Sequence, residues 1–170
     1  KERLLRVRGL KIVTPKKGIK IAKELFGGEI EQEVEEITGR RILGTVCRVK
    51  IKTKINEWLE VNAKLDTGAG ISSIDEDLAR QLGFTDAIEH FQRFNLKNVL
   101  TKEEVETISR QKIWKGLLSH EDIVAVVKTY SSHGISYRIE IPLKIELAGI
   151  KIHSNASVIM REHLQYPIII

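Results

Sequence analysis

The feature that most constrains the fold is a strict alternation of apolar and polar residues between residues 135 and 147. Such a period is typical of a β-strand whose two faces meet different surroundings, because successive side chains point to opposite faces. The apolar positions are Ile135, Tyr137, Ile139, Ile141, Leu143, Ile145 and Leu147. We therefore predict a long strand with one buried face. Pro142 cannot donate to a strand ladder, so we expect a sheet edge or a bulge there.

Other segments carry strand signals of the same kind. Residues 58–65 alternate, and a strand predicted over 40–55 precedes them across a short turn, so the two segments predict a hairpin. Further strands are predicted over 123–130, 150–160 and 166–170. Several antiparallel strands with few helices predict a mainly β fold, either a small closed barrel or a sandwich.

Helical signals are weaker. Ser73 and Glu76 have the spacing of a capping box, which predicts one short helix ending before Gly83. Thr101 and Glu104 have the same spacing. They predict a second helix, to about residue 114.

The chain divides into two predicted regions. We interpret residues 40–170 as the main domain, with an insertion at about 84–118 that covers or borders the functional site. Residues 1–39 combine a short strand over 9–14 with helical spacing over 19–25 and 30–37. They carry too little apolar surface for a core of their own. This extension is expected to be a linker, an interface element or the tail of an upstream domain.

One aspartate stands out as a candidate functional group. Asp66 directly follows the alternating strand and is itself followed by Thr67, Gly68 and Ala69. A turn at this point presents the carboxylate next to free backbone N–H groups. The functional interpretation is acid–base catalysis, and the structural alternative is an Asx-turn that ends the strand.

The residues from Leu65 to Ser73 resemble the active-site segment of retropepsin-like aspartic peptidases, in which Asp-Thr-Gly or Asp-Ser-Gly is followed by a small residue. Together with residues 63–69, the segments 126–128, Ala148-Gly149 and 160–170 are similar to a family described as ATP-dependent zinc proteases. Its members are retropepsin-like and occur with RimK-type ATP-grasp ligases. The chain departs from the family pattern at Met160 and lacks the glycine that follows the final apolar run.

The resemblance implies a closed retropepsin-like barrel and an aspartic peptidase that hydrolyses peptide bonds. One aspartate cannot serve as base and acid together, whereas two facing carboxylates that share a proton can. The chain has a single Asp-Thr-Gly, so a homodimer with Asp66 from each subunit is expected. Thr67, Gly68 and Ala69 would support the active-site loop, and Ile168, Ile169 and Ile170 would form the apolar support strand. A flap is expected at Ser131, Ser132, His133 and Gly134.

The implied substrate is a peptide or protein, which could be a peptide tail added by an associated ATP-grasp ligase. Residues 17–23 faintly resemble the closing helix of such ligases. A non-catalytic dimerisation or peptide-binding module on the same fold is the first alternative. A metal-dependent peptidase is the second, although none of the five histidines has the paired spacing of a zinc site. No metal and no cofactor are expected.

Charge and cysteine content bound the remaining possibilities. The net charge is +5, and seven Lys or Arg residues lie within residues 1–17, but no nucleic-acid recognition motif accompanies them, so we expect no nucleic-acid role. No apolar run reaches the length of a membrane span. The single cysteine, Cys47, suits a reducing, cytoplasmic compartment and is interpreted as a buried thiol rather than a nucleophile.

Overall fold

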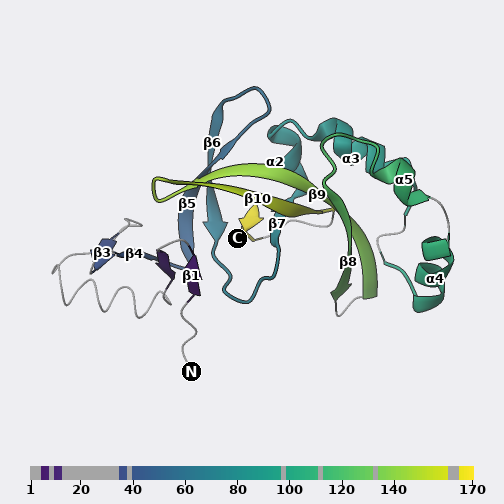
Figure 1. Cartoon of the computed structure of the whole chain (residues 1–170), viewed down its shortest axis with the longest axis horizontal. Helices are drawn as coiled ribbons and strands as arrows, with labels where there is room; N and C mark the ends of the chain where they lie inside the picture. The colour runs from purple at the N-terminus through teal and green to yellow at the C-terminus, as the bar shows by residue number, and fades with distance from the viewer. Residues whose placement is uncertain are drawn as a thin grey trace.

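The computed structural model describes residues 5–7, 10–12, 35–37, 40–96, 99–110, 113–131, 134–160 and 165–170. They form a small sheet near the N-terminus, a larger ring of strands, and helices along one side (Figure 1). The fold is mainly β, with a short helix after the Asp66 loop and a partly helical insertion, as predicted. In the described residues, no helix has the length and apolarity that crossing a membrane requires.

The small sheet has the strand order β1-β2-β4-β3. Its strands are β1 (Leu5–Val7), β2 (Leu10–Ile12), β3 (Glu35–Ile37) and β4 (Arg40–Leu43). The helix predicted over 30–37 is wrong for Glu35–Ile37, because these residues pair with β4 in an antiparallel ladder. Residues 30–34 and the helix predicted over 19–25 lie outside the described residues.

The larger sheet has seven strands in the order β10-β7-β11-β6-β5-β9-β8, and pairing of β9 with β10 closes all of them except β8 into a ring. Its strands are β5 (Val46–Lys52), β6 (Trp58–Lys64), β7 (Ser72–Asp75), β8 (Ala125–Ser131), β9 (Gly134–Leu147), β10 (Ile150–Ile159) and β11 (Ile168–Ile169). The predicted hairpin of β5 and β6 is confirmed. The strand predicted over 40–55 is instead two strands, β4 and β5, which belong to different sheets.

Two ladders of the larger sheet are parallel. β7 pairs with β10 in parallel, and β11 pairs with β6 in parallel. Parallel neighbours need long connections, because a tight turn reverses the chain direction. The two parallel pairs meet around the end of β6, so residues far apart in sequence assemble beside Asp66.

The long alternating segment forms β9, the strand that joins the parts of the ring. Its first half pairs with β8, its second half pairs with β10, and its last three residues also pair with β5. Pro142 lies opposite Asn155 of β10. On the other edge of β9, the β8 ladder ends at Glu140 and the β5 ladder begins at Ile145. The predicted edge position of Pro142 is therefore confirmed, because its missing N–H falls between two ladders.

The ring encloses the apolar core. Several of its side chains are less than 2% exposed: Val49, Ile51, Ile74, Ile139, Ile141, Ile145, Val158 and Ile168. Burial of each such side chain contributes roughly 1.5–3 kcal/mol relative to an exposed one. The alternating pattern therefore predicted the buried face of β9 correctly from Ile139 to Leu147, whereas Ser136 and Glu140 are buried on the face predicted to be polar.

Four helices follow β7. They are α2 (Glu76–Gln81), α3 (Thr85–Gln92), α4 (Lys102–Arg110) and α5 (Ile113–Leu117). The capping box predicted at Ser73 is wrong. The N-cap of α2 is Asp75, whose Oδ1 accepts a 2.8 Å hydrogen bond from the N–H of Asp77. Ser73 lies in β7, because residues 72–75 pair with both β10 and β11 as a strand of the sheet.

The capping box in the insertion is confirmed. The Glu104 N–H donates to Thr101 Oγ1 at 3.2 Å, and Glu104 Oε2 accepts from the Thr101 N–H at 2.9 Å. The described helical residues after this cap run to Arg110, residues 111 and 112 lie outside the described residues, and Trp114 belongs to α5. Trp114 packs against Tyr137 of β9, with ring centroids 4.8 Å apart, so the insertion lies against the first half of this strand.

Candidate functional site

Asp66 follows β6 immediately and is held through its backbone. Its N–H donates to the carbonyl of Ile170 at 2.8 Å, and the Ile170 N–H donates to the carbonyl of Lys64 at 2.9 Å. The preceding Leu65 is 3% exposed and donates its N–H to the carbonyl of Thr45 at 2.8 Å. Three segments distant in sequence thus fix the point at which the aspartate leaves the sheet.

The C-terminal strand β11 supports this arrangement from within the sheet. Ile168 is fully buried and lies opposite Ala63 of β6 and Ile74 of β7. Asp75 donates its N–H to the carbonyl of Pro167 at 2.9 Å, which ties the far end of the loop to the same segment. The final apolar run therefore lies between the two strands that carry the Asp66 loop.

The loop itself combines an ordered carboxylate with an exposed backbone. The Gly68 N–H donates to Asp66 Oδ1 at 2.9 Å, which is the Asx-type bond that the structural alternative anticipated. Asp66 and Thr67 are half-buried, while residues 68–71 are exposed. A Cβ at Gly68 would meet only Asp66 Oδ1, at 3.4 Å, and a Cβ at Gly70 would meet nothing within 4 Å. A single subunit therefore does not require glycine at either position for space.

A cavity of about 290 Å³ adjoins this loop. Its lining residues come from the loop, β7, β9, β10 and the C-terminus: Ala69, Gly70, Ile71, Ser72, Glu140, Ser154, Asn155 and Ile170. Glu140 is only 8% exposed, so a carboxylate is held at the cavity wall. Sequence reasoning missed this residue, because Glu140 looked like one more polar position on the outer face of an alternating strand.

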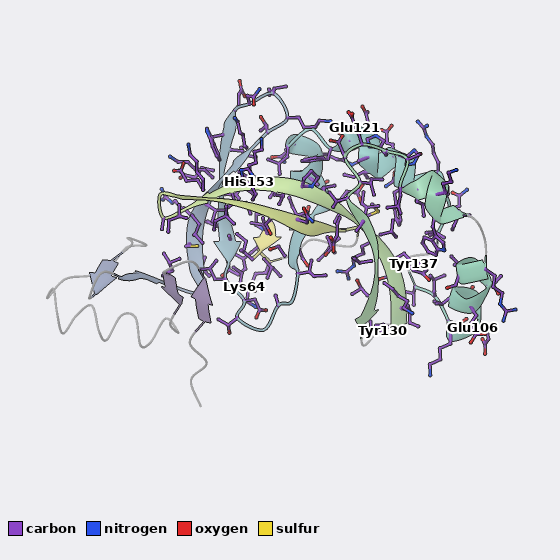
Figure 2. The ribbon with its side chains drawn as sticks, in the orientation of Figure 1. Lys64, Glu106, Glu121, Tyr130, Tyr137 and His153 are labelled. Carbon is purple, nitrogen blue, oxygen red and sulfur yellow. The ribbon has the colours of Figure 1, made fainter. Side chains whose placement is uncertain are left out.

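The proposed flap lies at the free end of the β8–β9 hairpin. The ladder runs to the pair Ser131–Gly134, while Ser132 and His133 lie outside the described residues. In Figure 1 the tip of this hairpin and the Asp66 loop extend toward the same edge of the molecule, and Figure 2 marks Tyr130 near the tip.

The hairpin is also fastened to the insertion. The Leu100 N–H donates to the carbonyl of Ile135 at 2.7 Å, and the Ile135 N–H donates back at 3.4 Å. Leu100 is 4% exposed. The first residues of β9 are therefore paired on both edges, with β8 on one and Leu100 on the other.

The remaining sequence candidates do not gather around Asp66. His90 of α3 and His120, just after the insertion, lie side by side, with ring centroids 5.3 Å apart. His133 and His163 are outside the described residues. Among the residues that the structure describes, no three His, Cys, Asp or Glu side chains are grouped as metal ligands would be.

Cys47 is a buried thiol, as predicted. It is 6% exposed in β5, and burial raises the pKa of its thiol from 9.0 to about 11. A thiol that stays protonated is a poor nucleophile, since the thiolate is the reactive form.

No protein-family model matches the chain, and no curated protein matches it. Several solved structures are similar to it, among them the following three. The simian foamy virus (mac) protease has 12% identity and a TM-score of 0.35, over 72% of this chain and 85% of that one. Lpg0085, a protein of unknown function from Legionella pneumophila, has 17% identity and a TM-score of 0.34, over 74% and 79%. The retroviral protease-like domain of Ddi1 from Leishmania major has 18% identity and a TM-score of 0.32, over 72% and 69%.

Proposed function

We propose that this chain is a retropepsin-like aspartic peptidase that works as a homodimer, with Asp66 of each subunit forming the catalytic pair. The observation that carries the proposal is the presentation of Asp66. Its backbone is fixed by the Ile170 carbonyl, while the residues that follow it are exposed and open to a second copy. The site in one chain is therefore half of the site that the chemistry needs.

The reaction assigns a different task to each carboxylate. One, ionised, takes a proton from a water molecule that attacks the peptide carbonyl, and the other, protonated, donates its proton to the carbonyl oxygen. Two carboxylates this close hold one proton between them, because like charges oppose double ionisation. Thr67 and Gly68 would allow the two loops to meet, Ile168–Ile170 would brace them, and the β8–β9 tip would cover the substrate.

The substrate class in this proposal is a peptide. Tails added by an associated RimK-type ATP-grasp ligase are a specific candidate, which rests on the resemblance alone. Assays should therefore compare a mixed peptide library with oligoglutamate chains, so that hydrolysis in general and tail trimming in particular are measured separately.

The first prediction concerns the carboxylate. Asp66→Asn should abolish peptide hydrolysis, because an amide can neither accept nor deliver the proton, whereas Asp86→Asn on α3 should leave the rate unchanged. Chelator treatment should leave wild-type activity intact. Hydrolysis by the Asp66→Asn variant at the wild-type rate, or loss of activity with chelator, would contradict the aspartic mechanism.

Mixing the two proteins tests whether the site is shared. If each site needs Asp66 from both subunits, activity should fall with the square of the wild-type fraction after Asp66→Asn chains exchange into the dimers. A linear fall would show that each chain works alone.

A non-catalytic peptide-binding or dimerisation module is the second candidate, and the Gly68 N–H bond to Asp66 Oδ1 favours it, because this bond also explains the aspartate as a turn residue. In that case Asp66→Ala, which removes the acceptor of the Gly68 N–H, should lower the unfolding temperature, whereas Asp66→Asn, which keeps an Oδ1 acceptor, should not. Neither peptide hydrolysis nor inhibition by a pepstatin-type transition-state analogue should be found for the wild-type dimer.

A further inference from the structure

A second, larger cavity lies away from the Asp66 loop, where the turn after β5 meets the middle of the β9–β10 hairpin. Its volume is about 450 Å³, within the range of small-molecule sites. Its lining residues are Lys52, Thr53, Lys54, Asn56, Phe84, Asp122, Pro142, Leu143, Lys144, His153, Ser154 and Asn155. It adjoins the cavity beside the Asp66 loop, because Ser154 and Asn155 line both.

The charges of the lining are unbalanced. Three lysines and a histidine face one carboxylate, Asp122, which is already bound to Lys54 at 2.5 Å. This bond raises the pKa of Lys54, with smaller contributions from Glu121 and Asp86. The charge of Lys54 is therefore compensated by carboxylates of the protein itself.

Lys52 and Lys144 are not neutralised in this way. In the described part of the chain, neither lies within ion-pair distance of a carboxylate. Lys144 lies directly opposite His153 in the β9–β10 ladder, and Lys52 has its ammonium group 6.0 Å from the centre of the Trp58 ring. Figure 2 shows His153 on the ribbon of these strands, far from Tyr130 at the hairpin tip.

The neighbouring pair in the same ladder shows that this is a local departure. Glu146 lies opposite Lys151 and also within 4.0 Å of Lys50. Cross-strand pairs of opposite charge stabilise a sheet, and pairs of like charge destabilise it. Outside the cavity, the ladder thus pairs residues of opposite charge. At the cavity wall it pairs Lys144 with the imidazole of His153, and a bound anion would supply the negative charge that this pair lacks.

We propose that this cavity binds a ligand with more than one carboxylate or phosphate group. Lys52, Lys144 and His153 would bind the anionic groups, Asn155 would donate a hydrogen bond, and Phe84 with Pro142 would contact the ligand's body. This site is independent of any reaction at Asp66.

The test is calorimetric titration of the full chain with citrate, tripolyphosphate and a tetraglutamate peptide, at low ionic strength and at about 0.15 M salt. Lys52→Gln and Lys144→Gln should each weaken binding about fivefold, since each removes a unit charge next to the anion. Lys144→Arg should retain binding. Asp122→Asn should strengthen it, because it frees Lys54. The probe that binds most tightly identifies the source of the anionic groups.

Lys151→Gln is the matched control, since it removes the same charge from the same β9–β10 hairpin, on the paired strand β10 and outside the cavity, and it should change binding less than about twofold. Thermal unfolding of every variant shows whether the fold is retained. The proposal is overturned if none of the three probes binds at low ionic strength. It is also overturned if Lys151→Gln weakens binding as much as Lys144→Gln, because that would indicate a diffuse charge effect.

Discussion

Single residues in this protein differ in how far their neighbours constrain them. The backbone of Asp66 is held by a hydrogen bond, and the loop that follows it is exposed. Cys47, by contrast, is buried in the apolar core. Glu140 lies between these extremes, as a largely buried carboxylate at the wall of the cavity beside the Asp66 loop.

The buried thiol makes stability depend on alkaline pH. Because the pKa of Cys47 rises from 9.0 in the unfolded chain to about 11 in the folded one, the folded state holds the proton that the unfolded state releases. The stabilisation is complete below pH 9 and is lost as the pH rises toward 11, by roughly 2–3 kcal/mol. Denaturant unfolding from pH 8 to 11 should show this loss for wild type, and a shallower dependence for Cys47→Ala. If the free energy of unfolding fell equally steeply with pH in the two proteins, Cys47 would not be the source of the loss.

Among the secondary-structure elements, the β8–β9 hairpin is the one whose freedom matters most for the proposed function. A flap needs to move, yet Leu100 pairs with Ile135 directly beside the tip. The insertion therefore restrains the hairpin where it would close over a substrate. Breaking this contact should alter both stability and substrate access.

Gly134 tests the packing of the hairpin against Val99 together with its own backbone conformation. Its φ is +123°, and a Cβ there would lie 2.7 Å from Val99 Cγ1, so Gly134→Ala should destabilise the fold by about 1–3 kcal/mol. Gly70→Ala is the matched control, since nothing lies within 4 Å of its Cβ position. Chemical denaturation measures both. A Gly134→Ala variant as stable as Gly70→Ala would mean that residue 99 is not held against the hairpin.

At the scale of the whole molecule, the ring of strands carries both proposed sites. The Asp66 loop and its cavity lie at the end of β6, and the cationic cavity lies beyond Asn155. The two cavities adjoin at Ser154 and Asn155 of β10.

Assembly is the last prediction. If the catalytic pair forms only between two subunits, hydrolysis per chain should fall on dilution, and the unfolding temperature should rise with protein concentration, because mass action favours the bound state. Sedimentation velocity across the same concentrations should show the monomer–dimer transition at the concentration where activity falls. Activity that persists in a monomer would contradict the shared site.

Local patterns determined much of this protein from sequence alone. Alternation located β6, β9 and β10 and the buried face of β9 from Ile139 onward, and three-residue spacing located the capping box at Thr101, because both depend on residues close in the chain. The position of Asp66 at the end of a strand was readable for the same reason.

Only the tertiary structure decided the rest. Ser73 is not an N-cap, because its segment pairs with β10 on one side and with β11 on the other, and so belongs to the sheet. Glu140 became buried, and Lys52 came to share a cavity with Lys144, through contacts between residues far apart in sequence. Periodicity describes which face a side chain occupies, whereas partners across a sheet depend on strand order and register, and these follow from the packing of the whole chain.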